Sequence, residues 1–441
     1  MLSVVARRDF QEMENDVAST AQTEYPEPNP AAVGFVMHLG RAMHSYGEAS
    51  HRLEDILGAL SDRLGLQGAQ FFSQPTSLMA SFGPVEFQRT YMLRVQPGDV
   101  DLRNLAAVHA VSLEVAQGHI PPAEGSARIA AIAASPSPYG PFLTTLAFGG
   151  ISGASCQLLG GGLREIVAGT VLGLGLRGFM LVAARVPRLG RVFEPLAALL
   201  VSGAAVALAH VGGPLSVLVA TLAGLIVLLP GLTLTNALNE LASRQLASGT
   251  ARLSGAFITF LGLAFGVALG NRLATAAFGA PAAVQAGSLP GWAGLVALVV
   301  SPLCGVVLLK AAPRDIPWIV VGTALGVGGG QVGAAALGVE LGAFAGAVAV
   351  GLASSIYARL QNRPPAVVLV PGILLLVPGS VGFRGLTSLM ERQTLAGIET
   401  AFSMMLTAVA LVSGLLIAGV IAPERRVRDP GAPTRRPRLS G

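Results

Sequence analysis

The sequence predicts a mostly α-helical, polytopic membrane protein that is preceded by a small soluble α+β domain. Only 12% of the 441 residues are charged and 52% are hydrophobic, whereas a soluble domain normally carries about 25% charged residues. Several apolar segments of roughly 20 residues, the length that crosses a bilayer, follow residue 140. The alternating pattern of a membrane β-barrel is absent from the sequence. The chain is therefore expected to cross the membrane as helices.

The region before these segments has a different pattern. Residues 1–30 are polar and end in PEPNP, which is typical of a disordered arm. Residues 31–138 begin with the helical pattern GFVMHLGRAMHSYGEASHRLEDILGALSDRLGL. Two short strand patterns follow, AQFFSQPTSLMASFG and VEFQRTYMLRV, and then two further helical stretches. Residues 31–138 are therefore predicted to form the α+β domain.

Ten membrane segments are expected after this domain. Tyr139, Trp292 and Trp318 lie at segment starts, where interfacial aromatic residues belong. Residues 423–441 form a basic tail. The segments are 141–160, 164–184, 194–211, 214–235, 251–271, 291–310, 316–337, 341–358, 366–383 and 396–421.

The positive charges predict the orientation. With the amino-terminal domain in the cytoplasm, the outside loops hold only Arg164, Arg272, Arg384 and Arg392. The inside loops hold Arg185, Arg188, Arg191, Arg244, Arg252, Lys310, Arg314, Arg359 and Arg363, and the tail adds six more arginines. This positive-inside bias predicts a multi-pass protein of the inner (plasma) membrane with both termini in the cytoplasm. It also explains the net charge of +5 without a nucleic-acid partner.

One proline-broken stretch occurs twice. LLPGLTLTNALNELASRQ at 228–245 and LVPGSVGFRGLTSLMERQ at 376–393 share 7 of 18 positions at a constant offset of 148. GTVLG at 169–173 likewise recurs as GTALG at 322–326. The duplication therefore extends beyond the broken stretch.

The two halves of the membrane part are predicted to be residues 139–285 and 286–422. Each half holds five segments, and an odd number makes consecutive halves cross the membrane in opposite orientations. The sequence therefore predicts two inverted five-helix repeats, a common construction in secondary transporters. A structural duplication without transport is the alternative.

The paired Pro-Gly breaks are the candidate substrate site. Proline lacks a backbone N–H and glycine frees the next torsion, so both helices are expected to be interrupted. Freed backbone groups in lipid are tolerated only against protein, water or a bound solute. Hydroxyls and amides would hold the ammonium and carboxylate of a zwitterion, and an arginine would pair with a carboxylate. A plain proline kink with helix-capping polar residues is the alternative. The predicted substrate-binding residues are Pro230, Gly231, Thr233, Thr235, Asn236, Asn239, Pro378, Gly379, Ser380 and Arg384.

Two further features bear on the mechanism. Glu399 in the last segment is the candidate for a coupling proton, with an interfacial or arginine-paired role as the alternative. No GxxxxGK[ST] loop is present, so no nucleotide cofactor is expected, and energy would come from an ion or solute gradient.

His44, Glu48, His51 and Asp55 form a polar stripe that could ligate a metal. A solvated helix face with a Glu48–Arg52 pair is the favoured interpretation, so no metal is expected.

Several stretches resemble the threonine/serine exporter family over about residues 31–422. They are LGRAMHSYGEASHRLEDILGALSDRLGL, PTSLMASF, DLRNLAAVHAVSLEVAQG and LVPGS. The resemblance implies export of small hydroxy amino acids driven by the proton-motive force, and it also admits dicarboxylate export. It marks Gly47, Glu48, Arg52 and Glu54 as the motif of the cytoplasmic domain. A transporter rather than an enzyme is expected, with a non-transporting protein whose soluble domain is a hydrolase or sensor as the alternative. A homo-oligomer is left open.

Overall fold

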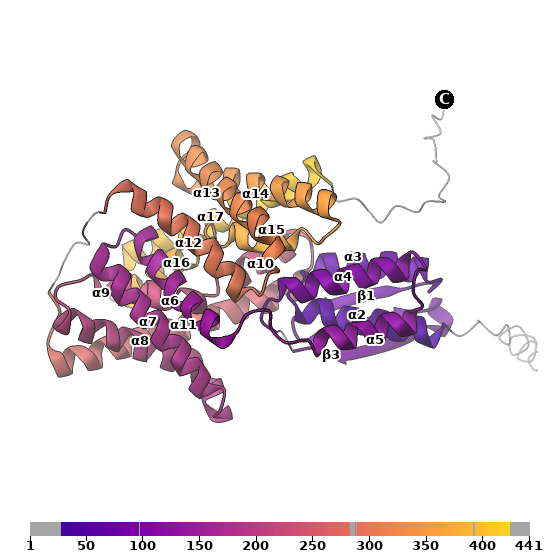
Figure 1. Cartoon of the computed structure of the whole chain (residues 1–441), viewed down its shortest axis with the longest axis horizontal. Helices are drawn as coiled ribbons and strands as arrows, with labels where there is room; N and C mark the ends of the chain where they lie inside the picture. Colours follow the sequence, from indigo (N-terminus) through magenta and orange to yellow (C-terminus); the bar gives the residue numbers. More distant parts are fainter. Residues whose placement is uncertain (1–27, 97, 283–286, 288, 391–392, 424–441) are drawn as a thin grey trace, which may run out of the picture.

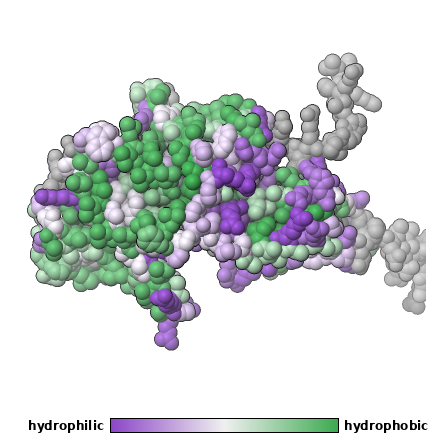
Figure 2. Space-filling model, in the orientation of Figure 1, coloured by the Kyte–Doolittle hydropathy of each residue, from purple (hydrophilic) through white to green (hydrophobic). Residues whose placement is uncertain are grey.

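The computed structural model describes residues 28–96, 98–282, 287, 289–390 and 393–423. Nearly all of the arm expected at 1–30 and of the tail expected at 423–441 lies outside the described residues. The chain is mostly helical, with one small sheet (Figure 1). Figure 2 shows hydrophobic residues gathered over the helices that follow α6, and hydrophilic residues over the domain at the right.

The α+β domain has a three-stranded antiparallel sheet of order β1-β2-β3. Two of its helices, α2 and α3, contact the sheet, and α4 and α5 pack against α2. Its core includes Phe35, Leu53, Leu57 and Leu78, none of which is exposed. The elements are α2 (Pro30–Ser45), α3 (Ser50–Arg63), β1 (Gln70–Gln74), β2 (Ser77–Phe82), the 3-10 turn η1 (Val85–Phe87), β3 (Arg89–Arg94), α4 (Leu102–Ala116) and α5 (Pro122–Ala133).

The sequence predicted two strands here, and the structure has three. The first strand pattern folds back on itself, because Pro75 and Thr76 make a tight turn between β1 and β2. The register pairs Gln74 with Ser77 across this turn. Proline has no N–H for a ladder hydrogen bond, so it favours a turn over the middle of a strand.

Twelve α-helices follow the α+β domain within the described residues. The first six are α6 (Pro141–Leu158), α7 (Leu163–Ala183), α8 (Phe193–Val211), α9 (Val217–Gly224), α10 (Gly231–Ala242) and α11 (Leu246–Phe278). The others are α12 (Gly291–Leu308), α13 (Ile316–Leu337), α14 (Val339–Gln361), α15 (Ala366–Ile373), α16 (Gly379–Met390) and α17 (Thr394–Ile421). Three 3-10 turns join them, η2 (Pro187–Val192), η3 (Ile226–Leu228) and η4 (Pro313–Asp315).

The described residues contain seven helices that are long and apolar enough to cross a membrane. The bent pair formed by α9 and the segment Ile226–Ala242, with an angle of 52°, raises the number to eight. A mostly helical, multi-pass protein is therefore confirmed, whereas length and composition support seven or eight spans and not the ten expected. Two expected segments explain the difference. Helix α6 is not among the apolar helices counted above, and the segment at 366–383 is divided between α15 and α16.

The α+β domain contacts the helical part where the start of α4 meets the end of α12. At the start of α4, the backbone N–H groups of Leu102 and Arg103 donate to the carbonyls of Leu309 and Lys310, at 3.0 and 3.2 Å. These carbonyls follow the end of α12, so the free donors of one helix satisfy the free acceptors of another. The Tyr139 hydroxyl donates to the neighbouring carbonyl of Ala311 at 2.7 Å.

Candidate functional site

The two Pro-Gly breaks have matching structures. Helix α9 ends at Gly224 and α10 begins at Gly231, while α15 ends at Ile373 and α16 begins at Gly379. Helices α10 and α16 are both 12 residues long and begin 148 positions apart. The next helices, α11 and α17, also begin 148 positions apart. The repeated sequence therefore produces a repeated break, and the interruptions expected at these two points are present.

The glycines of the two breaks lie against each other. A β-carbon added to Gly231 would lie 3.2 Å from the Cα of Gly379, and one added to Gly379 would lie 3.1 Å from the Cα of Gly231. Neither glycine has a positive φ. Torsional freedom was the expected role of these glycines, but here the absence of a side chain matters, because it lets two backbones approach closely.

A cavity of about 470 Å³ lies beside the second break, at the junction of α9, α16 and α17. Among the residues that line it, Arg384 is the predicted site residue. The Nε atom of Arg384 is buried and has no hydrogen-bond partner among the described residues. A guanidinium in such a setting suits a ligand carboxylate, which it can bind with two parallel hydrogen bonds. The lining residues are Leu218, Val381, Arg384, Thr387, Ser388, Gln393 and Thr400.

The other predicted substrate residues do not line this cavity. Thr235 is buried, and its hydroxyl donates to the Gly231 carbonyl at 3.1 Å, within its own helix. Thr233, Asn236 and Asn239 are half-buried on α10. Glu399 is exposed on α17, directly before the lining residue Thr400. The cavity lining thus includes one of the ten predicted substrate residues, Arg384, and Pro378, Gly379 and Ser380 of the same stretch lie outside it.

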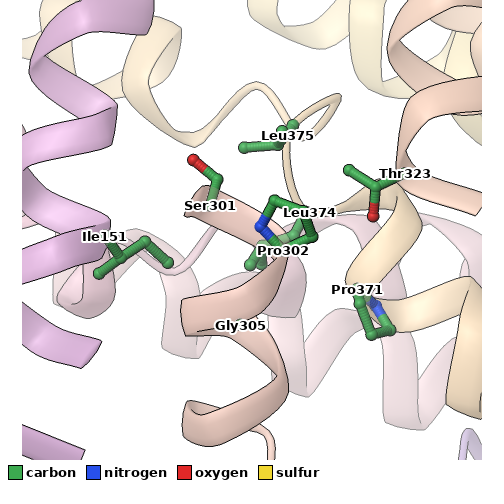
Figure 3. Close-up of a pocket in the computed structure, with 8 residues that line it drawn as sticks. All are labelled: Ile151, Ser301, Pro302, Gly305, Thr323, Pro371, Leu374 and Leu375. Atoms are coloured by element: carbon green, nitrogen blue, oxygen red, sulfur yellow. The ribbon is translucent and has the colours of Figure 1, made fainter. Parts of the chain in front are cut away.

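A second cavity is much smaller and lies between α6, α12, α13 and α15 (Figure 3). Its volume of about 10 Å³ is room for about one water molecule. Ser301 and Thr323 carry buried hydroxyls without a partner among the described residues, and Figure 3 shows these hydroxyls pointing in different directions. This space therefore suits a single water and not a solute.

Sequence reasoning missed the buried carboxylate of Glu240, which lies inside the first repeated stretch. Its side chain is fully buried and pairs with the Arg252 guanidinium at 3.0 Å. The Ser248 hydroxyl donates to it at 2.7 Å, and the backbone N–H of Ser50 in the α+β domain donates to it at 3.3 Å. An acidic residue in an apolar stretch, twelve positions before an arginine, was the available signal. Buried carboxylates in such stretches are uncommon and usually paired.

Glu54 of the family motif lies in the same contact region. Glu54 accepts hydrogen bonds from the Ser73 N–H and from the Gln245 side chain, both at 2.7 Å. Burial raises the pKa of Glu54, although both hydrogen bonds lower it. The Ser50 and Ser248 hydroxyl oxygens lie 2.9 Å apart. Ser50 therefore contacts α10 and α11, and Glu54 of the motif contacts the turn between them.

The polar stripe expected on one helix is wrong. Helix α2 ends at Ser45 and α3 begins at Ser50, because Gly47 has a φ of +95° and makes a turn. Glu48 lies in this turn and pairs with Arg52 at 3.1 Å, as expected, but it is only 2% exposed. The expected solvated face is therefore wrong as well, because the turn packs on the segment before α4. His44 contacts the Pro75 carbonyl at 3.0 Å, and burial lowers its pKa.

Comparisons with known proteins agree with this architecture. The family model described as "Putative threonine/serine exporter" matches residues 34–274. The model described as "Threonine/Serine exporter, ThrE" matches residues 294–421. Together they cover the α+β domain and nearly all of the membrane helices.

Several curated fungal proteins are similar to the chain. "Pheromone-regulated membrane protein 10" of Yarrowia lipolytica is 26% identical over 373 residues, which is 80% of this chain and 30% of that protein. The protein of the same name in Eremothecium gossypii is 27% identical over 366 residues, 79% of this chain and 48% of that protein. The match thus spans 30% to 48% of the length of these two relatives. No solved structure matches it.

Proposed function

Because the chain belongs to the threonine/serine exporter family, we propose that it is a secondary-active exporter of small hydroxy amino acids, threonine and serine. The proton-motive force drives transport, and the solute site opens alternately to the two sides of the membrane. The observation that carries this proposal is the Arg384 cavity. It places a guanidinium whose buried Nε has no partner in the described part of the chain beside the hydroxyls and amide of Thr387, Ser388, Thr400 and Gln393.

The chemistry of this cavity fits a small zwitterion. The guanidinium would bind the carboxylate, and the neutral oxygen atoms would accept hydrogen bonds from the ammonium and the hydroxyl. A volume of about 470 Å³ exceeds what one amino acid requires, so water would enter with the solute. The first stretch, around Asn236 and Asn239, is proposed to contact the solute in the opposite access state.

Repetition of helix boundaries supports two inverted five-helix halves. Helices α6 and α12 are both 18 residues long and begin 150 positions apart. The contacts repeat too: α7 packs on α9 as α13 packs on α15, and α8 packs on α11 as α14 packs on α17. Between the halves, α10 contacts α17 and α16 contacts α11. Such reciprocal contacts are those of two halves related by a pseudo-twofold axis.

The proposed orientation puts the α+β domain and both termini in the cytoplasm of a cell with this protein in its plasma membrane. The arginine distribution supports it. Glu399, directly before Thr400 of the cavity wall, is the proposed carrier of the coupling proton.

Efflux from proteoliposomes tests the function. Vesicles loaded with labelled threonine should release it through the purified protein, and an imposed proton gradient should drive transport uphill. Arg384→Ala should slow release, whereas Arg272→Ala, which replaces an exposed arginine outside the cavity, should not. Equal release from protein-free vesicles would refute transport of threonine.

A dicarboxylate is the second candidate, because a guanidinium also suits a solute that carries two negative charges and no ammonium. The same vesicles loaded with labelled succinate separate the two. Release of succinate without release of threonine would assign the dicarboxylate function.

A further inference from the structure

The wall of the Arg384 cavity has a counterpart in the first repeat. At the offset of 148, Arg384 corresponds to Asn236, Ser388 to Glu240, Gln393 to Gln245 and Thr400 to Arg252. In the opposite direction, Leu218 corresponds to Ala366. If the halves are inverted, this counterpart opens towards the other side of the membrane.

The α+β domain occupies that counterpart. The Ser50 N–H donates to Glu240 at 3.3 Å, and Gln245 donates to Glu54 at 2.7 Å. The Glu240 carboxylate in turn holds Arg252. Ala366 belongs to a buried hydrophobic cluster whose other fully buried members all come from the α+β domain. The α+β domain therefore contacts three counterpart positions, Glu240, Gln245 and Ala366. The fourth, Arg252, pairs with Glu240.

The start of α3 is suited to this contact. Ser50 is the first residue of α3, so its N–H is one of the donors that a helix leaves unsatisfied, at the positive end of the helix dipole. A buried carboxylate satisfies such a donor and is stabilised by it. A few hydrogen bonds of 2.7 to 3.3 Å connect the motif to α10 and α11. A contact of this kind can separate and reform.

We propose that the inner mouth of the transport path lies between α10, α11 and α15, and that the start of α3 is its gate. In this structure the outer cavity at Arg384 is open and the gate is closed on Glu240. Loading from the inside requires α3 to leave Glu240. The direction of transport through this gate rests on the proposed function. The gate itself is inferred from the contact between Ser50 and Glu240.

A disulfide across the contact locks the gate. The Ser50 and Ser248 hydroxyl oxygens lie 2.9 Å apart. Sulfur atoms at these two positions would need only a small shift to form an S–S bond, whose length is about 2.05 Å. The pair Ser50→Cys and Ser248→Cys is made with Cys156→Ala and Cys304→Ala, which remove the native thiols. The matched control is Ser81→Cys with Thr90→Cys, whose hydroxyls lie 2.8 Å apart on β2 and β3, inside the domain.

Threonine efflux is measured before oxidation, after it and after reduction. Oxidation of the gate pair should cut efflux to about a tenth or less, and reduction should restore it, because alternating access needs the inner mouth to open. The control pair should transport equally in all three conditions. Unchanged efflux through a fully cross-linked gate pair would overturn the proposal.

A second readout does not depend on the solute. The variant Asn239→Cys places a thiol on α10. An impermeant maleimide is added on the side of the membrane that carries the α+β domain, and the labelling rate is measured. The locked gate should slow its labelling about tenfold or more, and Glu240→Gln, which removes the charge that Ser50 binds, should speed it. Equal labelling rates in the locked, reduced and Glu240→Gln proteins would refute the gate. A change in labelling without any threonine transport would instead refute the proposed substrate and leave the gate standing.

Discussion

Gly231 and Gly379 lie backbone against backbone, with 3.2 Å between a β-carbon placed on Gly231 and the Cα of Gly379. These glycines belong to breaks 148 positions apart in the sequence. The two halves of the membrane part thus meet where each helix is interrupted. A side chain at either glycine would move the breaks apart, since backbone atoms cannot rotate out of the way as side chains can.

Gly231→Ala should therefore destabilise the protein and slow transport. The added methyl group would overlap the Val377 side chain and press on the Gly379 backbone, at a cost of about 1–3 kcal/mol for overpacking. Thermal unfolding of the purified protein and threonine efflux are the measurements. Gly255→Ala on α11 is the control, because a β-carbon there meets nothing within 4 Å. Equal unfolding temperatures for the two variants would show that the breaks tolerate separation.

Arg384→Ala should weaken threonine binding. Loss of one charge-assisted contact costs about 1.5–3 kcal/mol, or roughly ten- to a hundredfold in affinity. Arg384→Lys should recover part of the affinity, because lysine keeps the charge but loses the two-pronged geometry. Calorimetry on monodisperse protein measures both, with Arg272→Ala as the control. If Arg384→Ala binds threonine as the unmodified protein does, the solute site lies elsewhere.

The apolar helices and the repeated breaks could be predicted from the sequence, because apolar length and a constant offset are local signals. The number of spans could not, since seven or eight are supported where ten were expected. The position of each break followed from Pro-Gly for the same reason. The contact between Ser50 and Glu240 could not, since it joins residues 190 positions apart and no pattern along the chain specifies it. The stretch from His44 to Asp55 was therefore predicted as an isolated helix face.

The turn at Gly47 shows a different kind of error. Helical spacing was counted through the glycine from His44 to Asp55, although glycine often ends a helix with a positive φ. Gly47 does so, with a φ of +95°. The same residue that carried the family resemblance also divided the predicted stripe between two helices.

Glu399→Gln should uncouple transport from the proton gradient. The variant should still exchange internal for external threonine, because the solute site is intact, but a proton gradient should no longer drive uphill transport. Glu194→Gln, at the start of α8, is the control and should remain coupled. Normal uphill transport by Glu399→Gln would assign proton coupling to another group.

Single cysteines should report the orientation. Val211, the last residue of α8, is 89% exposed, and Arg188 is exposed between α7 and α8. They lie at opposite ends of one predicted span. Both variants are made in a background that lacks the native cysteines. An impermeant thiol reagent should label Val211→Cys in intact cells. It should label Arg188→Cys only after the cells are opened. Labelling of Arg188→Cys in intact cells would reverse the orientation that the arginines predict.

His109 should make the α+β domain sensitive to acid. Burial, and secondly the positive charge of Arg52, lower the pKa of His109 from 6.5 to about 4. The unfolded chain therefore takes up a proton near pH 6.5, while the folded domain resists it until about pH 4. Stability is consequently unaffected by this group above pH 6.5 and falls as the pH drops from about 6.5 to about 4, by up to about 3 kcal/mol.

Replacement of this imidazole separates its contribution from that of other groups. The lowered pKa of His44 acts in the same direction, so His109→Gln should reduce the acid sensitivity and not abolish it. Hydrogen exchange of α4 in the full-length protein, corrected for intrinsic rates, should show protection falling less between about pH 7 and about pH 5 in the variant. A slope identical to that of the unmodified protein would mean that His109 accepts its proton without opening the domain.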